Sequence, residues 1–504
     1  MSRLIAVLIL IVASFMDLLD TTIVNVALPS IQTDLGATAS QLEWTVSGYV
    51  LAYAVCLIPG GRMGDIFGRR RLFVVGLAGF TGASVLCAAA SSGDMLVTSR
   101  IIQGVFAALM TPQVLSIIQV LFAPKERAAV LGALGMISTI GAAAGPLVGG
   151  VLVSSEAFGL GWRSVFLINV PVGIILFVAA IIFVPESRSL LKPRLDVPGA
   201  VLVSAGLFLM VFALIEGREH NWNGWIWSML LASPFVLALF VRYQARRDRR
   251  DGSALVPPSL FNNRGYSAGV ITQFAFSASS GGFFLILMLY LQLGLNFTAI
   301  EAALATLPFS LGALAGGAAA VPLGPRLGKV LIACGAMAQI IGLLWIAKIV
   351  RDHSDTLVGT DLILPMALAG LGLTFEVVPL MDVTLSNTKV ANAGAASGVF
   401  GMVQQIGSAL GIAVVGIVFF GLAGADSTSA SLREAFLGGI WVPIAALSLS
   451  VIAAFLLPSV SAVIAHKGGA ESEQSGLAAD RPRVASTKTG ESPAGTHGCP
   501  EQRS

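Results

Sequence analysis

Two carboxylates interrupt the first long apolar segment of the chain, which begins at Leu4. Asp17 and Asp20 are about one helical turn apart, so in a helix both lie on the face that also carries Asn25. A carboxylate inside a lipid bilayer costs about 2.5 to 3.5 kcal/mol on insertion scales, so it requires a cation, a watery cavity or a proton. We therefore predict that Asp20 is a proton site. Asp17 is either a second proton site or a residue that lines a cavity.

Arg100 is a cation that the expected geometry places at the depth of Asp20. If the chain starts in the cytoplasm, the helix expected at 95–121 enters from outside, and Arg100 lies about 7 to 8 Å deep. A neighbouring arginine favours an ionised carboxylate, whereas removal from water favours a protonated one. A shift of the Arg100 helix would therefore change proton binding at Asp20. The alternative is a static buried ion pair that fixes the packing of the helices.

Other polar and aromatic side chains in apolar segments are candidates for contact with a ligand. Glu376 lies inside the helix expected at 362–384, where a carboxylate can bind a proton, a cationic ligand or a donor on a neighbouring helix. Phe276 contributes to an aromatic surface that suits either a hydrophobic substrate or lipid. The candidate substrate-cavity residues are Asn25, Gln103, Gln273, Phe276 and Glu376.

The positions of the histidines and cysteines argue against both a metal site and a histidine proton relay. All four histidines fall in expected loops or in the tail, and the four cysteines lack the spacing of metal ligands. Carboxylates must therefore carry any protonation chemistry. We predict no metal, no cofactor and no catalytic residue.

Glycine is concentrated in two segments, where it allows a tight turn or a close approach. Residues 61–71 form an expected cytoplasmic loop, in which Asp65 can cap a helix or pair with arginine. The arginines of this loop are also a simple topology signal. In the helix expected at 128–153, a glycine stripe lets another backbone approach, which by itself indicates packing only. The gating-loop candidates are Gly61, Asp65, Gly68, Arg69 and Arg70, and the stripe comprises Gly141, Gly145, Pro146, Gly149 and Gly150.

The composition is typical of a membrane protein. The chain has 504 residues, of which 56% are hydrophobic and 11% are charged. Apolar runs of spanning length indicate about fourteen transmembrane helices. They are expected near 4–28, 44–60, 72–91, 95–121, 128–153, 164–184, 197–215, 225–241, 266–291, 301–322, 330–349, 362–384, 395–421 and 436–457.

The distribution of lysine and arginine predicts the orientation. With an even number of spans both termini lie on one side, and roughly 24 of the 30 Lys and Arg then face the cytoplasm. The seven tryptophans fall near the opposite helix ends, where interfacial rings are favoured. We predict a multi-pass protein of the cell membrane with both termini in the cytoplasm. The net charge of +3 reflects this asymmetry rather than nucleic-acid binding.

Two glycine features recur at nearly the same offset along the chain. Gly68 and Gly328 are 260 residues apart, and Gly149 and Gly411 are 262 apart, as expected for a duplicated bundle. The predicted fold is an all-α polytopic membrane protein with two six-helix bundles and two inserted helices. The predicted domains are an N-terminal bundle at 1–190, an inserted pair and linker at 191–250, a C-terminal bundle at 251–458 and a disordered cytoplasmic tail at 459–504.

Taken in order, these motifs resemble the fourteen-helix drug:proton antiporters of the major facilitator superfamily. The resemblance rests on residues 19–29, 61–71, 100–104, 141–150, 162–173 and 405–413. It implies the major facilitator fold and proton-driven export of small amphipathic or cationic compounds, as in multidrug or antibiotic efflux, by alternating access. It also implies that Asp20 carries the proton, that Arg100 modulates it, and that a monomer in the lipid bilayer is sufficient.

Three other functions stay open on the sequence. A metabolite symporter of the same fold would differ in the direction of flux, and residues 141–150 argue against it by resemblance. A membrane-embedded enzyme would need a catalytic cluster, which the short external loops lack. A non-transporting sensor would bind a ligand without counterflow. We predict a transporter rather than an enzyme, and the sequence has no Gly-Lys-Ser/Thr loop for direct use of ATP.

Overall fold

The computed structural model describes residues 2–122, 124–155, 159–188, 196–251, 254–353, 357–386, 393–424 and 428–457, and every structural statement below refers to these residues. The predicted tail lies outside them. The described residues are helical, with no strand among them. Thirteen helical segments are long and apolar enough to cross a membrane. A further helix of 31 residues, α5, stands where another span is predicted. These findings confirm the all-α polytopic fold.

The helices fall into three groups along the chain. The N-terminal helices are α1 (Ser2–Leu35), α2 (Ala39–Phe67), α3 (Arg69–Ala88), α4 (Gly93–Leu121), α5 (Pro124–Ser154), α6 (Ser164–Leu167) and α7 (Asn169–Phe183). The inserted pair is α8 (Val197–Glu216) and α9 (Gly224–Asp251). The C-terminal helices are α10 (Arg264–Leu289), α11 (Ala299–Leu327), α12 (Lys329–Asp352), α13 (Ile363–Ser386), α14 (Ala393–Ala423), α15 (Ser429–Gly439) and α16 (Trp441–Phe455). Short helical turns precede or follow some of them, namely η2 (Gly161–Arg163), η3 (Pro258–Asn262), η4 (Tyr290–Gly294) and η5 (Gly359–Leu362).

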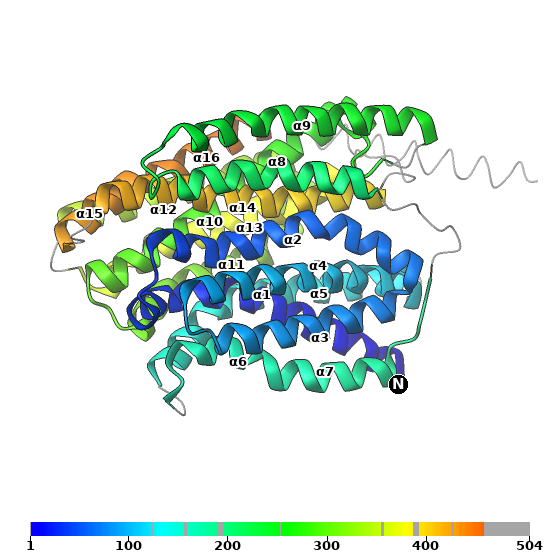
Figure 1. Cartoon of the computed structure of the whole chain (residues 1–504), viewed down its shortest axis with the longest axis horizontal. Helices are drawn as coiled ribbons and strands as arrows, with labels where there is room; N and C mark the ends of the chain where they lie inside the picture. The colour runs from blue at the N-terminus through cyan, green and yellow to red at the C-terminus, as the bar shows by residue number, and fades with distance from the viewer. Residues whose placement is uncertain are drawn as a thin grey trace, which may run out of the picture. The chain divides into compact units, whose positions relative to one another are not determined.

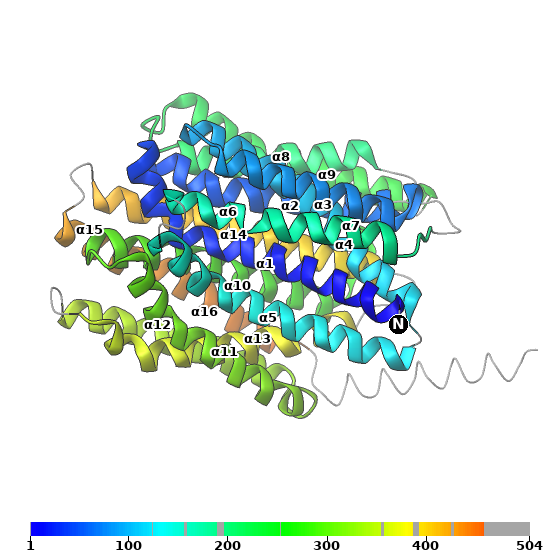
Figure 2. The ribbon, with the colours of Figure 1, turned by 90° about the horizontal axis from the view of Figure 1, so that it is seen from below.

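The N-terminal and C-terminal helices meet along two seams. At one seam α2 packs against α14, and at the other α5 packs against α11 (Figure 2). The inserted helices α8 and α9 lie side by side, and α8 contacts both α2 and α14 (Figure 1). The inserted pair therefore covers the first seam and touches both groups of helices.

Several helices are longer than the sequence predicted, which corrects two boundaries. α1 continues through Pro29 to Leu35, because a membrane helix tolerates proline where its surroundings satisfy the freed backbone groups. α2 continues to Phe67, so residues 61–67 of the expected loop are helical. Gly68 alone separates α2 from α3, and its φ of 117° is one that glycine adopts readily.

The glycine joint between α2 and α3 has a counterpart in the C-terminal helices. Gly68 donates its backbone N–H to the carbonyl of Gly64 at 2.9 Å, and Gly328 donates to Gly324 at the same distance. Gly328 also has a positive φ, of 48°, and likewise stands alone between α11 and α12. The two joints have the offset expected for a duplication, whereas the domain boundaries stay predictions.

Candidate functional site

Asp20 lies fully buried on α1, at the centre of a polar network among the N-terminal helices. Arg100 of α4 donates from Nη1 to Oδ2 at 2.6 Å, which forms an ion pair. Gln103 of α4 and Asn169 at the start of α7 donate to Oδ1 at 2.9 and 2.7 Å. All three donors are N–H groups, so the contacts match an ionised carboxylate. Protonation of Asp20 would weaken its attraction for the charged Arg100.

Arg100 is itself held by α2. Its Nε donates to the carbonyl of Thr45 at 3.0 Å, and its guanidinium stands 4.1 Å from the ring centroid of Tyr49. Gly104 allows this approach, since a Cβ there would be 2.3 Å from the Tyr49 carbonyl oxygen. The Nη2 group is buried without a hydrogen-bond partner among the described residues. One donor group of Arg100 is thus available to another acceptor.

Asp17 lies one turn from Asp20 and has different partners. The hydroxyl of Tyr49 donates to its Oδ1 at 2.6 Å, and Thr111 of α4 donates to its Oδ2 at 3.1 Å. Asp17 is 5% exposed. Tyr49 therefore contacts Asp17 through its hydroxyl and Arg100 through its ring, so it connects the two carboxylates of α1.

The substrate-cavity candidates do not form one cluster. Gln103 belongs to the Asp20 network, and Asn25 is half-buried with its amide directed to the carbonyl of Thr22 on its own helix. On α10, Phe276 is buried and Gln273 donates to the hydroxyl of Ser277 at 3.0 Å. Glu376 lies apart, among the C-terminal helices.

Glu376 of α13 is fully buried, and its carboxylate contacts two helices of the C-terminal group. Gln339 of α12 donates to its Oε2 at 2.7 Å, and the hydroxyl of Ser450 on α16 bonds to its Oε1. The hydrogen bond to a neighbouring helix that the sequence left open is therefore present.

The glycine stripe of α5 faces α1 and α11. A Cβ at Gly145 would stand 1.9 Å from Thr22 Oγ1, and one at Gly149 would stand 2.8 Å from Ile23. A Cβ at Gly150 would stand 2.6 Å from Ala303 of α11. Gly141 and Pro146 are also buried. The stripe thus brings α5 against the turn of α1 that follows Asp20.

The candidate gating segment, residues 61–71, connects three helices through the side chain of Arg69. Its Nη2 pairs with Asp65 Oδ1 at 2.7 Å, and its Nη1 donates to the carbonyl of Ser116 on α4 at 3.4 Å. Arg70 donates through its backbone N–H to Glu186 at 3.2 Å, beyond the end of α7. Arg69 therefore ties the ends of α2 and α3 to α4.

Replacing Arg69 by alanine is expected to slow the conformational cycle more than it weakens ligand binding, because Arg69 lies at a helix joint and not in the Asp20 network. Substrate affinity and turnover, measured on the same preparation, test this. Arg71→Ala is the matched control, since the Arg71 side chain is 65% exposed. A large loss of affinity with unchanged turnover would contradict the gating role.

A polar cluster that the sequence did not predict links the inserted pair to α2 and α14. Glu43 of α2 is 1% exposed, and Arg218, just beyond α8, lies 3.9 Å from its Oε1. The guanidinium of Arg218 also stands 4.8 Å from the ring centroid of Phe420 on α14. Trp44 donates to Glu216 at 2.9 Å. The amino-acid pattern does not indicate this cluster, because its residues on α2 lie about 175 residues from their partners beyond α8, in a different predicted domain.

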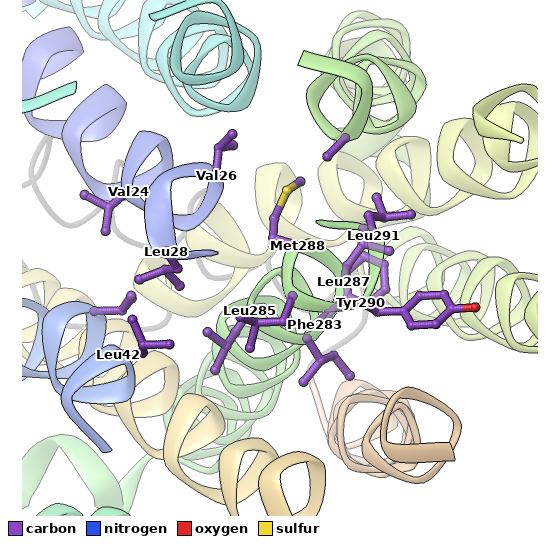
Figure 3. Close-up of a cluster of buried hydrophobic side chains, with 14 of the residues drawn as sticks. Val24, Val26, Leu28, Leu42, Phe283, Leu285, Leu287, Met288, Tyr290 and Leu291 are labelled. Atoms are coloured by element: carbon purple, nitrogen blue, oxygen red, sulfur yellow. The ribbon is translucent and has the colours of Figure 1, made fainter. Parts of the chain in front are cut away.

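Towards their ends, α1 and α10 meet in a buried hydrophobic cluster. Figure 3 shows Val26 and Leu28 of α1 and Leu285 and Met288 of α10 in this cluster, and all four are buried. The side chain of Gln292 in η4 donates to the carbonyl of Val26 at 3.0 Å. These contacts close the N-terminal and C-terminal helices against each other at this end.

The helices and the buried polar network define a multi-pass membrane protein with an ionisable centre between its spans. The pattern of the Major Facilitator Superfamily matches residues 10–412, and the chain belongs to this superfamily. It is therefore a transporter and not an enzyme.

Its relatives by sequence include proteins of antibiotic export and resistance. A "Probable actinorhodin transporter" of Streptomyces coelicolor is 42% identical over 83% of this chain and 72% of its own length. The "Cephamycin export protein CmcT" of Amycolatopsis lactamdurans is 35% identical, covering 84% of this chain and 87% of its own. The "Puromycin resistance protein pur8" of Streptomyces alboniger is 33% identical, covering 82% and 81%. These relatives confirm the family resemblance drawn from the motifs.

Solved structures are similar in fold alone. A bacterial homologue of the human lysosomal transporter Spinster, in an inward-facing and occupied conformation, has a TM-score of 0.60 at 17% identity over 89% of this chain and 95% of its own. A POT family transporter in complex with 5-aminolevulinic acid has a TM-score of 0.64 at 14% identity, covering 88% and 94%.

Proposed function

We propose that this chain is a proton-driven antiporter of the cell membrane that exports small amphipathic compounds by alternating access. The observation that carries the proposal is the buried Asp20–Arg100 pair, with a contact of 2.6 Å, in a chain whose relatives include proteins of antibiotic export and resistance. Charged side chains inside membrane spans are costly and rare, and they mark proton relays and ion pathways.

The mechanism follows from the donors around Asp20. In the described conformation Arg100, Gln103 and Asn169 satisfy the ionised carboxylate. When Asp20 takes up a proton, its attraction for Arg100 falls, and Arg100 and α4 are released from α1. Because Arg100 also bonds to α2, this release loosens contacts among three helices. Proton binding at Asp20 is thereby coupled to rearrangement of the helices.

The predicted orientation assigns a side to the hydrophobic cluster of Figure 3. With both termini in the cytoplasm, the ends of α1 and α10 that meet in this cluster face outward. The described conformation is then closed on the outer side. A substrate would enter between the two groups of helices from the cytoplasm, reach the closed cluster that begins beside Asn25, and leave after the cluster opens.

Transport of a panel of antibiotics and dyes tests the proposal. Inverted vesicles that contain the protein should take up at least one compound when their interior is acidified, and release it when the gradient collapses. A susceptibility panel in a pump-deficient host should identify the same compound. Uptake in the opposite direction would indicate a symporter, and binding without flux would indicate a sensor.

A further inference from the structure

Glu376 is a fully buried carboxyl group whose hydrogen-bond partners are neutral side chains. Its partners are the Gln339 amide, at 2.7 Å, and the Ser450 hydroxyl. No described cation forms an ion pair with it. Burying an ionised carboxylate in an apolar environment is costly when no cation offsets its charge. A permanent salt bridge therefore does not account for Glu376.

The surroundings of Glu376 differ from those of Asp20 in a way that bears on protonation. Asp20 accepts hydrogen bonds from three N–H donors, one of them the charged Arg100, which favours its ionised form. Glu376 contacts a hydroxyl, which can donate or accept a hydrogen bond. When Glu376 is ionised, Ser450 donates to Oε1. When Glu376 is protonated at Oε1, it donates to Ser450, whose own hydrogen can turn to a carbonyl one turn back in α16.

Gln339 connects Glu376 to a small cavity. Its side chain lines this cavity, which lies between α10, α11, α12 and α13 and is comparable in size to a single water molecule. Ser279 and Ser280 of α10 also line it, so the walls carry polar groups that can hold water. Gln339 thus lines the cavity and also donates to Oε2 of Glu376.

The close packing of α12 and α13 brings the two side chains together. A Cβ at Gly335 would stand 2.6 Å from the backbone nitrogen of Glu376, and one at Gly372 would stand 2.9 Å from that of Gln339. Only glycine permits this approach at both positions. The contact between Gln339 and Glu376 is therefore specified by the backbone and does not depend on a chance side-chain conformation.

Other titratable side chains on the packed helices do not compete for this role. On α12 and α13 they are exposed or lie at helix ends, and α16 carries none. Those on α10 and α11, namely Arg264, Tyr266, Glu301 and Arg326, lie near helix ends. Lys329 is half-buried at the start of α12, where it donates to the carbonyl of Phe455 at 3.2 Å. The exposed residues are Cys334, Lys348, Arg351, Asp352 and Asp382.

We propose that Glu376 is a second proton-binding site, located in the C-terminal helices, which exchanges its proton with water through the cavity beside Gln339. This site extends the proposed function, because a carboxyl group there adds a proton to the cycle that Asp20 serves. It assigns Glu376 to proton binding and not to contact with a cationic substrate.

Infrared difference spectroscopy on the purified protein in lipid nanodiscs tests the proposal without requiring transport. As the pH is raised, the wild type should lose a C=O band of a protonated carboxyl group, and the band should shift in deuterated water. Glu376→Gln should lack this band, whereas Asp382→Asn, on the same helix but exposed, should keep it. Gln339→Leu retains the carboxyl group and should shift the band, because Oε2 loses its donor.

The outcomes separate this proposal from the proposed function. An unchanged spectrum in Glu376→Gln, or a band that persists at every pH at which the protein is folded, would overturn the second proton site. Proton-driven flux of substrate into vesicles is measured separately and tests the antiporter proposal. If the wild type shows no proton-driven flux, the antiporter proposal fails even when the band titrates. If the wild type does show proton-driven flux, Glu376→Gln should lower the number of protons transported per substrate while some transport remains.

Discussion

Replacing Asp20 by asparagine is expected to abolish proton-driven export while the protein still inserts and folds. Asparagine has nearly the same volume, and its amide oxygen can still accept from Arg100 at the position of Oδ2. It can neither bind nor release a proton, so protonation can no longer switch the attraction between residue 20 and Arg100. We expect flux driven by a pH gradient to fall to background for every substrate, whether neutral or cationic.

The design must separate energisation from folding. Removing the carboxylate leaves Arg100 buried without its ion-pair partner, which costs about 3 to 5 kcal/mol in comparable cases. Thermal unfolding in detergent, and binding of a substrate without a gradient, show whether the variant is intact. Asp94→Asn is the control, because Asp94 is an exposed carboxylate on the same helix as Arg100. Gradient-driven flux at the wild-type rate in Asp20→Asn would remove Asp20 from the mechanism.

The pairing of Asp20 with Arg100 could be predicted from the sequence, because the depth of a residue in the membrane changes nearly linearly with its position along a helix. Both residues sit at similar depths on helices that run in opposite directions, and the structure places them 2.6 Å apart. Asn169 belongs to a motif that the sequence analysis used, yet its contact with Asp20 was not predicted. The reason is that α7 begins at Asn169 itself, so its direction depends on how α7 docks.

Rotation of helices about their axes explains most of what the sequence did not predict. Tyr49 and Thr111 stand in apolar helices, and hydropathy does not tell which face of α2 or α4 meets Asp17. The same holds for Glu376, whose depth was predicted, whereas its partners Gln339 and Ser450 were not. Glycine supplies part of the missing information, because close approaches such as Gly335 against Glu376 fix the rotation of both helices.

The prediction of a loop at 61–71 was wrong, because these residues are helical except for Gly68. Asp65 and Arg69 are charged, and charged residues between apolar runs favour the assignment of a loop. In the structure they form an i, i+4 pair across the joint at Gly68, so they stabilise the helix ends and the turn between them. Glycine with a positive φ marks such a joint, and the same feature at Gly328 shows that one residue is enough to reverse the chain.

Replacing Gly145 by leucine is expected to block the transport cycle with a smaller effect on expression. A Cβ at this position would already stand 1.9 Å from Thr22 Oγ1 and 3.1 Å from the backbone nitrogen of Ile23, so a leucine must push α5 and α1 apart. Overpacking of this kind costs about 1 to 3 kcal/mol, and 1.4 kcal/mol corresponds to about tenfold in an equilibrium or rate. Because the displaced turn of α1 directly follows Asp20, we expect turnover to fall by about tenfold or more.

A matched control distinguishes close packing from the general effect of adding bulk to a membrane helix. Gly82 of α3 is exposed, and a Cβ there would meet no atom within 4 Å, so Gly82→Leu should leave turnover close to that of the wild type. Gly145→Ala adds only the Cβ, which would stand 2.8 Å from Thr22 Cβ, so its turnover should lie between that of Gly145→Leu and that of the wild type. Turnover, substrate binding and the amount of folded protein should be measured for all three variants. Normal turnover by folded Gly145→Leu would contradict this prediction. The transport cycle would then tolerate α1 and α5 held apart beside Asp20.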